Sequence, residues 1–294
     1  MGQNARKRAV GLAPIAVIAM ILYVAFLLYP IASSLATSFT DKNPLKPASS
    51  FIGLENYAQL FTDARLHRSL AFTLIVVVFV TVFANVLGLA FAMLLNRPTR
   101  NYRVMRTLVF IPQVLSGVIV AFIWRSILTQ QGLLNVTLRN AGLTHAPVSW
   151  IGTPELATLS ICVVVTWITT AFATVVYTAS LQSVPVELYE AARVDGAGAW
   201  KRFINVTLPL IAPGTTISVT LCLITTFKLY DVIAVLTGGG PANSTKSTAY
   251  YLIDTAFTNN RFGYASAIAI LLLALTAVVA YGTTGLLRKR EAVL

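Results

Sequence analysis

Long uncharged, apolar stretches alternate with shorter polar ones along this chain. Six stretches of at least 18 residues contain no Asp, Glu, Lys or Arg: residues 9–40, 69–96, 107–124, 156–186, 203–227 and 262–287. A helix needs about 20 apolar residues to cross the hydrocarbon core of a bilayer, so each stretch is long enough or nearly so. Transmembrane β-strands would give short alternating segments instead. The pattern predicts an all-α membrane protein with six transmembrane helices, in a single domain of residues 1–294.

Two of the six stretches need separate interpretation. The first follows the basic residues 6–8, as the core of a secretory signal does, but such a core has only about 7–15 residues. We therefore expect a retained first helix. The third stretch is the shortest and contains Pro112, and it can extend past Arg125 to Leu128 if the arginine side chain reaches toward the interface.

Composition agrees with a membrane protein. Only 11% of the residues are charged and 56% are hydrophobic, whereas a soluble domain has about 25% charged residues. The net charge of +12 could indicate a nucleic-acid partner, but long uncharged stretches separate the basic residues, so we expect none. Cys162 and Cys222 both lie in apolar stretches, which excludes a disulfide framework.

The distribution of basic residues predicts the orientation in the bilayer. Thirteen of the 22 Lys and Arg residues fall in the short segments 1–8, 97–106, 187–202 and 288–294. The longer segments 41–68, 125–155 and 228–261 hold the other nine. Because cytoplasmic loops are enriched in Lys and Arg, both termini should be cytoplasmic, and 41–68 and 228–261 should be extracytoplasmic loops.

One cytoplasmic loop, residues 183–209, has the pattern of a folded element. Pro185 suits the first turn of a helix, Leu188, Ala191 and Ala192 fall on one helical face, and Gly196 can end the helix with a positive φ. A second short helix is expected over residues 199–205. Taken alone, this pattern is also typical of a short amphipathic connector on the membrane surface.

The motifs in and around this loop resemble a known family. The string Glu190-Ala191-Ala192-x-x-Asp195-Gly196-Ala197 resembles the EAA loop of ABC-importer permeases. Val206 is a minor departure, since the family usually has isoleucine there. Further motifs are similar to the maltose-type, binding-protein-dependent carbohydrate branch: Phe51-x-Gly53-Leu54-x-Asn56-Tyr57, Pro112, Trp124-Arg125 and Leu236-Thr237-x-Gly239-Gly240-Pro241.

The resemblance implies a type I ABC-importer permease in the bacterial inner membrane, which imports a carbohydrate by alternating access. It also implies a second homologous permease, two ATPase subunits that bind ATP and Mg²⁺, and an extracytoplasmic solute-binding protein. In this family the EAA loop docks on the ATPase, and the Gly239-Gly240-Pro241 loop would face the binding protein. The coupling residues are then Glu190, Ala191, Ala192, Arg193, Asp195 and Gly196.

Glu190 has two possible roles. It could offer its carboxylate to a basic group of the ATPase, which would fix orientation as well as add affinity. It could instead form a local pair with Arg193, three residues further along the helix, worth only about 0.2–0.5 kcal/mol. We expect the coupling role, and the resemblance is the reason.

The chain carries no recognisable catalytic chemistry. The glycine-rich segment before Lys246 has Thr245 where a Walker A loop needs glycine. His67 and His145 are the only histidines, and no metal-binding spacing occurs. We therefore expect no catalytic residue, metal or cofactor on this chain, and ATP hydrolysis on a partner.

Polar residues at the end of the fifth stretch are candidates for the substrate path. Thr226, Lys228, Tyr230 and Asp231 lie there, and on a helix Lys228 and Asp231 would be neighbours three residues apart. The alternative is that Lys228 and Tyr230 merely sit at the membrane interface. Trp167, inside the fourth stretch, could stack on a sugar ring or pack against a neighbouring helix.

Two other classes of protein fit a polytopic membrane chain. A secondary transporter driven by an ion gradient predicts acidic residues near the bilayer midplane, and the six stretches contain none. A purely structural membrane subunit is the other class, and it would be favoured if the purified chain never associated with an ATPase.

Overall fold

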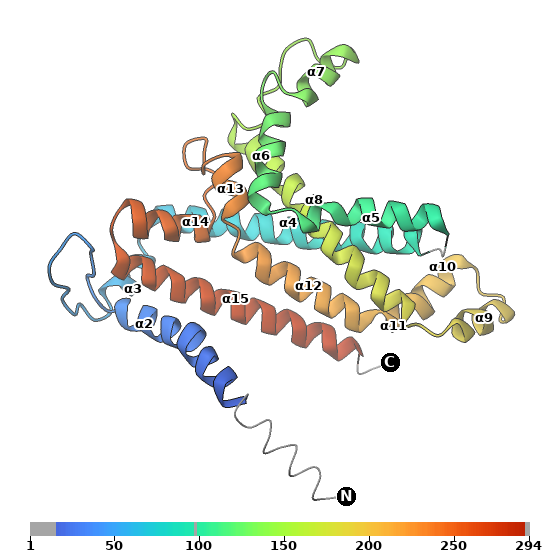
Figure 1. Ribbon diagram of the computed structural model, residues 1–294, viewed down its shortest axis with the longest axis horizontal. Coiled ribbons are helices and arrows are strands. Elements are labelled where there is room, and N and C mark those ends of the chain that lie inside the picture. The colour runs from blue at the N-terminus through green and yellow to red at the C-terminus, as the bar shows by residue number, and fades with distance from the viewer. Residues whose placement is uncertain (1–15, 97–98, 292–294) are drawn as a thin grey trace, which may run out of the picture. The chain divides into compact units, whose positions relative to one another are not determined.

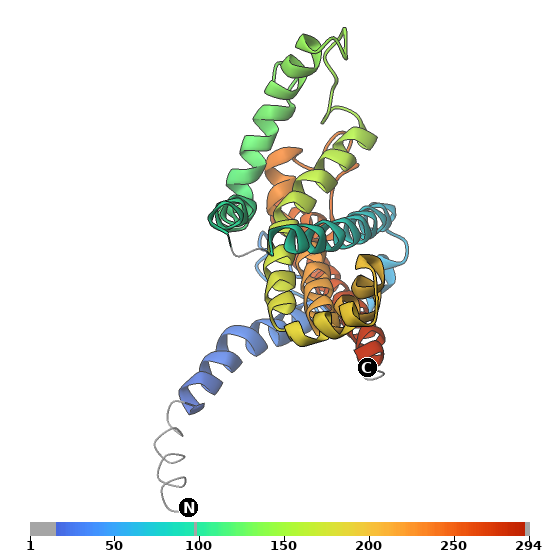
Figure 2. The same ribbon diagram turned by 90° about the vertical axis from the view of Figure 1, so that its right-hand side faces the viewer.

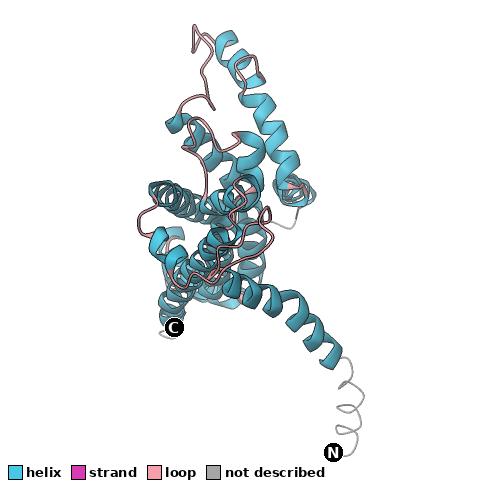
Figure 3. Cartoon of the chain, turned by 90° about the vertical axis from the view of Figure 1, so that its left-hand side faces the viewer, coloured by secondary structure: helices cyan, strands magenta, loops and turns pink. Residues whose placement is uncertain are grey.

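The computed structural model describes residues 16–96 and 99–291. Within these ranges the regular structure is helical, apart from an isolated bridge between Thr40 and Phe51 (Figures 1 and 3). The all-α prediction is confirmed. The chain divides into two compact units, one of residues up to Asp63 with Leu252–Leu271, and one of Ala64–Tyr251 with the residues from Leu272 onward.

Five helices are long and apolar enough to cross a membrane, and a bent pair of helices counts as a sixth. They are Ala16–Thr37, Ala64–Leu95, Gly117–Asn140, Pro154–Gln182, Phe262–Lys289 and the pair Ala199–Leu210 with Ala212–Phe227. The start of the first predicted stretch, residues 9–15, lies outside the described residues. Five of the six predicted stretches overlap these spans closely, and the third does not.

The third predicted span, residues 107–124, is wrong in its bounds. The chain forms α5 (Arg100–Val114) and α6 (Gly117–Leu128), and Leu115 and Ser116 between them are extended, with ψ of 144° and 138°. Pro112 cannot donate the backbone hydrogen bond of its turn, and the serine and glycine that follow are weak helix formers. The membrane-length segment is instead α6 continued by α7 (Leu133–Asn140).

The first unit contains the first span and the start of the last. Its elements are η1 (Val24–Leu28), α2 (Tyr29–Thr37), α3 (Glu55–Leu60), η3 (Asp254–Thr258) and the first residues of α15 (Phe262–Glu291). The buried amide of Asn56 donates to the carbonyls of Ser38 and Thr40, at 2.8 and 2.9 Å. These bonds satisfy carbonyls that the end of α2 leaves without a helical partner.

The second unit is built on two long helices, α4 (Ala64–Leu95) and α8 (Pro154–Gln182), which run side by side (Figures 1 and 2). Small residues allow this close packing: a Cβ on Gly88 would lie 2.5 Å from the Cβ of Ala173. Such small-residue contacts are typical of helix pairs in membranes. The hydrophobic effect does not drive helices together in lipid, so close van der Waals packing contributes instead. Residues 64–68, expected in a loop, form the first turns of α4.

The remaining elements of this unit pack on or extend from that pair. A buried cluster of aliphatic side chains joins α4, α6, α8 and α13 (Asp231–Leu236), including Val80, Val120, Ile161 and Ile233. A second cluster joins α4, α12 (Ala212–Phe227) and the later part of α15 through Val77, Phe227 and Leu272. The other elements are α9 (Val186–Val194), α10 (Ala199–Arg202), η2 (Phe203–Thr207), α11 (Leu208–Leu210) and α14 (Thr248–Ile253).

Candidate functional site

The loop predicted to couple to an ATPase is a folded helix–turn–helix. Pro185 precedes α9 in an extended conformation, with φ −58° and ψ 131°, and Gly196 ends the helix with φ +72°. The backbone N–H of Ala197 donates to the Ala192 carbonyl at 2.9 Å, which closes the turn. Helix α10 then begins after Gly198. The local structure predicted for residues 183–209 is thus present, including the positive φ of Gly196.

The loop presents apolar side chains that nothing in the described chain covers. Helix α9 has no buried residue, and Val194 is 88% exposed. Trp200 on α10 is 70% exposed, and Leu188 and Ala191 are exposed as well. The hydroxyl groups of Tyr189 and Thr207, 3.1 Å apart, hold α9 against η2. A folded element with an uncovered apolar surface is typical of a docking site for another protein.

The charged residues of this loop make no ion pair with one another. Glu190, Arg193 and Asp195 are all exposed. The local pair between Glu190 and Arg193, considered as the alternative role of the glutamate, is not formed. The carboxylate of Glu190 therefore remains available to a partner.

The C-terminal end of the fifth span differs from the helical arrangement expected from sequence. Helix α12 ends at Phe227 and α13 begins at Asp231, so Lys228 and Asp231 are not neighbours on one helix, and no ion pair joins them. The last turn tightens, with Lys228 N–H donating to the Thr225 carbonyl at 3.2 Å. The Ser247 hydroxyl then donates to the carbonyl of buried Leu229 and fixes the departing chain.

The five substrate-path candidates fall into different environments. Thr226 is buried, and its hydroxyl donates to the Cys222 carbonyl at 2.7 Å. Lys228 is exposed, whereas Tyr230 is half-buried. Asp231 is exposed too, with its carboxylate against the first residue of α6, Gly117.

Two aromatic contacts involve these candidates. The rings of Tyr230 and Tyr250 lie 5.5 Å apart. Trp167 is 42% exposed and packs edge-on against Trp124, with 5.8 Å between ring centroids and 71° between planes. The indole of Trp167 therefore contacts a neighbouring helix and still offers part of its surface.

The Gly239-Gly240-Pro241 loop is a compact turn held by hydrogen bonds. Gly238 and Gly239 have φ of +61° and +80°, a region that favours glycine. The Thr245 hydroxyl donates to the Gly240 carbonyl at 2.6 Å, and the Tyr250 hydroxyl donates to the Gly238 carbonyl at 3.1 Å. These contacts give the loop a defined shape.

One buried polar contact between long helices was not singled out from the sequence. The Tyr177 hydroxyl on α8 donates to Asn85 Oδ1 on α4 at 3.0 Å, and the Asn85 amide donates to the Thr81 carbonyl at 2.7 Å. Polar residues inside a membrane are costly unless they are paired and often have a functional role. The sequence feature that could have indicated this contact is Asn85, an amide side chain in the middle of the uncharged stretch 69–96. No cluster of three potential metal ligands occurs in the part of the chain that the structure describes.

Long apolar helices and a folded, uncovered helical loop define a multi-pass membrane subunit that works with partners. The chain belongs to the family described as binding-protein-dependent transport system inner membrane component, whose family model matches residues 84–292. It is therefore an ABC-importer permease, a multi-pass protein of the inner membrane. This membership does not support the alternative of an ion-gradient-driven secondary transporter.

Curated relatives cover nearly the whole chain. The probable starch degradation products transport system permease protein AmyD of Thermoanaerobacterium thermosulfurigenes is 34% identical, over 90% of this chain and 89% of the relative. The trehalose/maltose transport system permease protein MalF of Thermococcus litoralis is also 34% identical, over 90% of each chain.

Solved structures share the fold. A chain of a bacterial alginate ABC transporter, in complex with an alginate pentasaccharide-bound periplasmic protein, has a TM-score of 0.85. The match covers 98% of this chain and 97% of the other at 22% identity. A chain of the methionine ABC transporter MetNI has a TM-score of 0.57 and 21% identity, over 77% of this chain and 96% of the other.

Proposed function

We propose that this chain is the permease subunit of an ATP-driven importer of a carbohydrate, and that it works by alternating access. The names of its relatives support the substrate class, since they refer to starch degradation products and to trehalose and maltose. The importer would contain a second homologous permease, two ATPase subunits and an extracytoplasmic solute-binding protein. ATP and Mg²⁺ would bind the ATPase subunits, and this chain would hydrolyse nothing.

The coupling role of the loop rests on one observation, a folded helix–turn–helix without an apolar cover. Side chains such as Val194 and Trp200 would gain about 25 cal/mol per Å² of apolar surface by docking in a cleft of the ATPase. The small residues Ala191 and Ala192 would let the partner approach the helix backbone closely. Glu190 would pair with a basic group, and Arg193 and Asp195 would face the rim of the contact.

Replacing Glu190 tests this assignment, and α9 supplies a matched control. Glu190→Ala should weaken association with the ATPase subunits about tenfold to a hundredfold, because a hydrogen bond to a charged group contributes about 1.5–3 kcal/mol. Glu187→Ala removes the same charge from the first turn of the same helix. It should leave association within about twofold. Co-purification and ATPase activity of the assembled complex measure both variants, and equal losses would contradict a specific role for Glu190.

The proposed orientation has its own test. Cysteine at Asn101, in the segment rich in arginine, should resist membrane-impermeant thiol reagents in intact cells, because that segment would be cytoplasmic. Cysteine at Asn243, in the loop that follows α13, should react. Permeabilised cells provide the control, since both positions should react there. Labelling of Asn101 alone in intact cells would reverse the proposed topology.

We also propose that Trp167, Lys228, Tyr230 and Asp231 line the sugar path, with Thr226 supporting the turn behind them. The Gly239-Gly240-Pro241 loop would face the binding protein.

A double-mutant cycle tests whether Lys228 and Asp231 act independently. Because no ion pair joins them, their alanine substitutions should affect uptake additively. A coupling energy above about 1 kcal/mol would show that the two charges act as a pair instead.

A further inference from the structure

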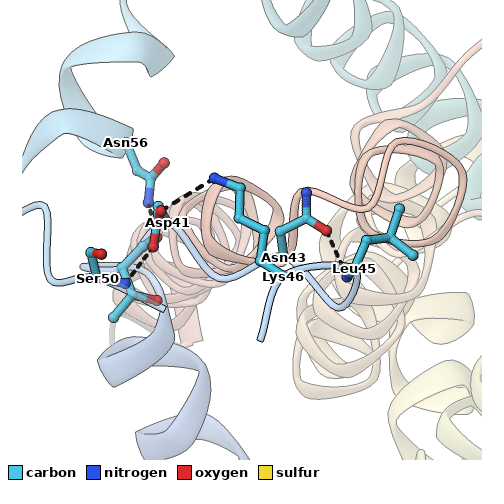
Figure 4. Close-up of polar contacts among 7 residues, drawn as sticks. Asp41, Asn43, Leu45, Lys46, Ser50 and Asn56 are labelled. Carbon is cyan, nitrogen blue, oxygen red and sulfur yellow. Dashed lines mark hydrogen bonds and ion pairs between the residues drawn. The ribbon is translucent and has the colours of Figure 1, made fainter. Parts of the chain in front are cut away.

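The first unit contains a cavity of about 560 Å³ with several charged side chains in its wall. Its wall is formed by the segment that follows the first span, by α3 and by the start of α15, and it includes Lys42, Lys46, Glu55, Gln59 and Arg261. Figure 4 shows the side of this cavity near Asp41 and Lys46. Its volume falls in the range of small-molecule binding sites, about 300–1,000 Å³.

The cavity is a built site with fixed walls. The backbone N–H of Gly263 donates to the Lys42 carbonyl at 3.1 Å, which joins the two segments that carry Lys42 and Arg261. Arg261 donates to Gln59 Oε1 at 2.6 Å, and its guanidinium lies 4.8 Å from the centre of the Tyr264 ring. The orientation of Arg261 is therefore held by neighbours on α3 and α15.

Two of the three cations on the wall have no acidic partner in the described chain. Lys46 pairs with Asp41 at 3.5 Å, whereas Lys42 forms no ion pair and Arg261 contacts a neutral amide. One acid, Glu55, also lacks an ionic partner among the described residues. The cavity thus offers two cations for an anionic group and one carboxylate for a hydrogen-bond donor or cation.

The position of these cations matches the depth of lipid headgroups. Lys42 lies within five residues of Thr37, where the first span ends, and Arg261 directly precedes Phe262, where the last span begins. Basic side chains at the ends of membrane helices lie at the level of phosphate groups. The first span has no buried residue in its most apolar window, so the described chain leaves this span uncovered.

Exposed apolar residues are close in sequence to residues of the cavity wall. Leu45, Phe51, Leu54 and Phe61 are 67–81% exposed, and each is next to a residue of the wall or within two positions of one. Phenylalanine and leucine beside basic residues are typical of segments that lie in the interface of a bilayer. A protein partner would also cover apolar residues, but the adjacent span ends favour a lipid.

We propose that this cavity binds the phosphodiester headgroup of a membrane phospholipid. Lys42 and Arg261 contact the phosphate, and Glu55 accepts a hydrogen bond from the amine or hydroxyl at the end of the headgroup. The site therefore prefers phosphatidylethanolamine and phosphatidylglycerol to phosphatidylcholine, whose quaternary nitrogen has no hydrogen to donate.

The test uses the assembled transporter in nanodiscs that contain equal parts of these three lipids. After transfer to detergent, native mass spectrometry counts the phospholipids that stay bound. The wild type should retain phosphatidylethanolamine or phosphatidylglycerol in preference to phosphatidylcholine. Lys42→Gln should lower this retention about tenfold, because it removes one charge-assisted contact.

Three control variants test which side chains of the wall hold the headgroup. Lys46→Gln removes a cation of the same cavity whose charge Asp41 already balances, and it should leave retention within about twofold. Arg261→Lys should keep the lipid. Glu55→Gln, which keeps a hydrogen-bond acceptor but loses the charge, should reduce the preference over phosphatidylcholine.

Other results would overturn the proposal. Equal retention of all three lipids by the wild type and by Lys42→Gln would exclude a specific headgroup site. Displacement of the lipid signal by millimolar glycerol 1-phosphate, which has no acyl chains, would identify a site for a soluble anion. Unchanged lipid retention in Lys42→Gln, with weaker stimulation of the ATPase by the solute-binding protein, would identify a protein docking site.

Discussion

Substitution of Gly196 tests whether the shape of the proposed coupling loop, residues 183–209, and not only its sequence, is needed for transport. Gly196 has φ +72°, and a Cβ added there would meet no atom within 4 Å. The whole cost of Gly196→Ser is therefore backbone strain, about 1–2 kcal/mol for a residue with a Cβ in the left-handed region. That energy lowers the ratio of folded to unfolded turn about 5–30-fold.

Two measurements report the effect of Gly196→Ser on the turn. Hydrogen exchange of the Ala197 amide, which closes the turn by donating to Ala192, should accelerate by the same 5–30-fold. ATPase stimulation by the solute-binding protein, in the reconstituted complex, should fall with it. Gly196→Asn should be milder, because asparagine occupies the left-handed region more readily than serine does.

The chain supplies a matched control two residues away. Gly198 precedes α10 with φ −64° and also has no atom within 4 Å of an added Cβ. Gly198→Ser introduces the same side chain at a conformation that serine adopts freely and at an N-cap position that it favours. Equal exchange rates and equal ATPase stimulation in the two serine variants would refute the argument from backbone conformation.

Two further predictions concern packing and pH. Gly88→Ala should destabilise the purified subunit by about 1–3 kcal/mol in thermal unfolding, because the added Cβ would lie 2.5 Å from that of Ala173. The control is Gly282→Ala, where an added Cβ meets no atom within 4 Å, and it should be neutral or stabilising by up to about 1 kcal/mol. A hydrogen bond from the Ser50 N–H lowers the pKa of Asp41 below its ordinary value of 3.8, and the ammonium group of Lys46 lowers it further by a smaller amount. The ionised Asp41 carboxylate therefore stabilises the loop between Asp41 and Ser50 above pH 3.8, and this stabilisation is lost as the pH falls through the lower pKa of the folded state. Asp41→Asn should abolish this pH dependence, measured by hydrogen exchange of the same loop.

The sequence predicted the helices because a bilayer imposes a simple rule of length and polarity. That rule specifies where apolar stretches lie, and it does not specify where a stretch bends. Pro112 was visible in the third stretch, but the break lies at Leu115 and Ser116, and the span continues into α7. The fifth stretch likewise bends by 67° where Ala199–Leu210 meets Ala212–Phe227.

The two candidate sites differ in how well local sequence describes them. The turn after α9 depends on Gly196 and its immediate neighbours, so residue types and spacing were enough to predict it. The end of α12 depends on Ser247, which is 18 residues from the carbonyl of Leu229 that it contacts. No periodicity within the fifth stretch encodes that contact, so the expected helical pairing of Lys228 with Asp231 was wrong.

The proposed coupling loop is joined to the membrane helices by a hydroxyl contact and a buried cluster. Tyr189 on α9 contacts Thr207 in η2, and Ile211 follows at the bend before α12. Ile211 is fully buried and packs in a cluster with Tyr177 and Leu181 of α8. Because packed interiors are stiff, a displacement that reaches Ile211 would move this cluster as a whole. The same α8 residue, Tyr177, donates to Asn85 on α4, so the cluster and the polar contact between the two long helices have to move together.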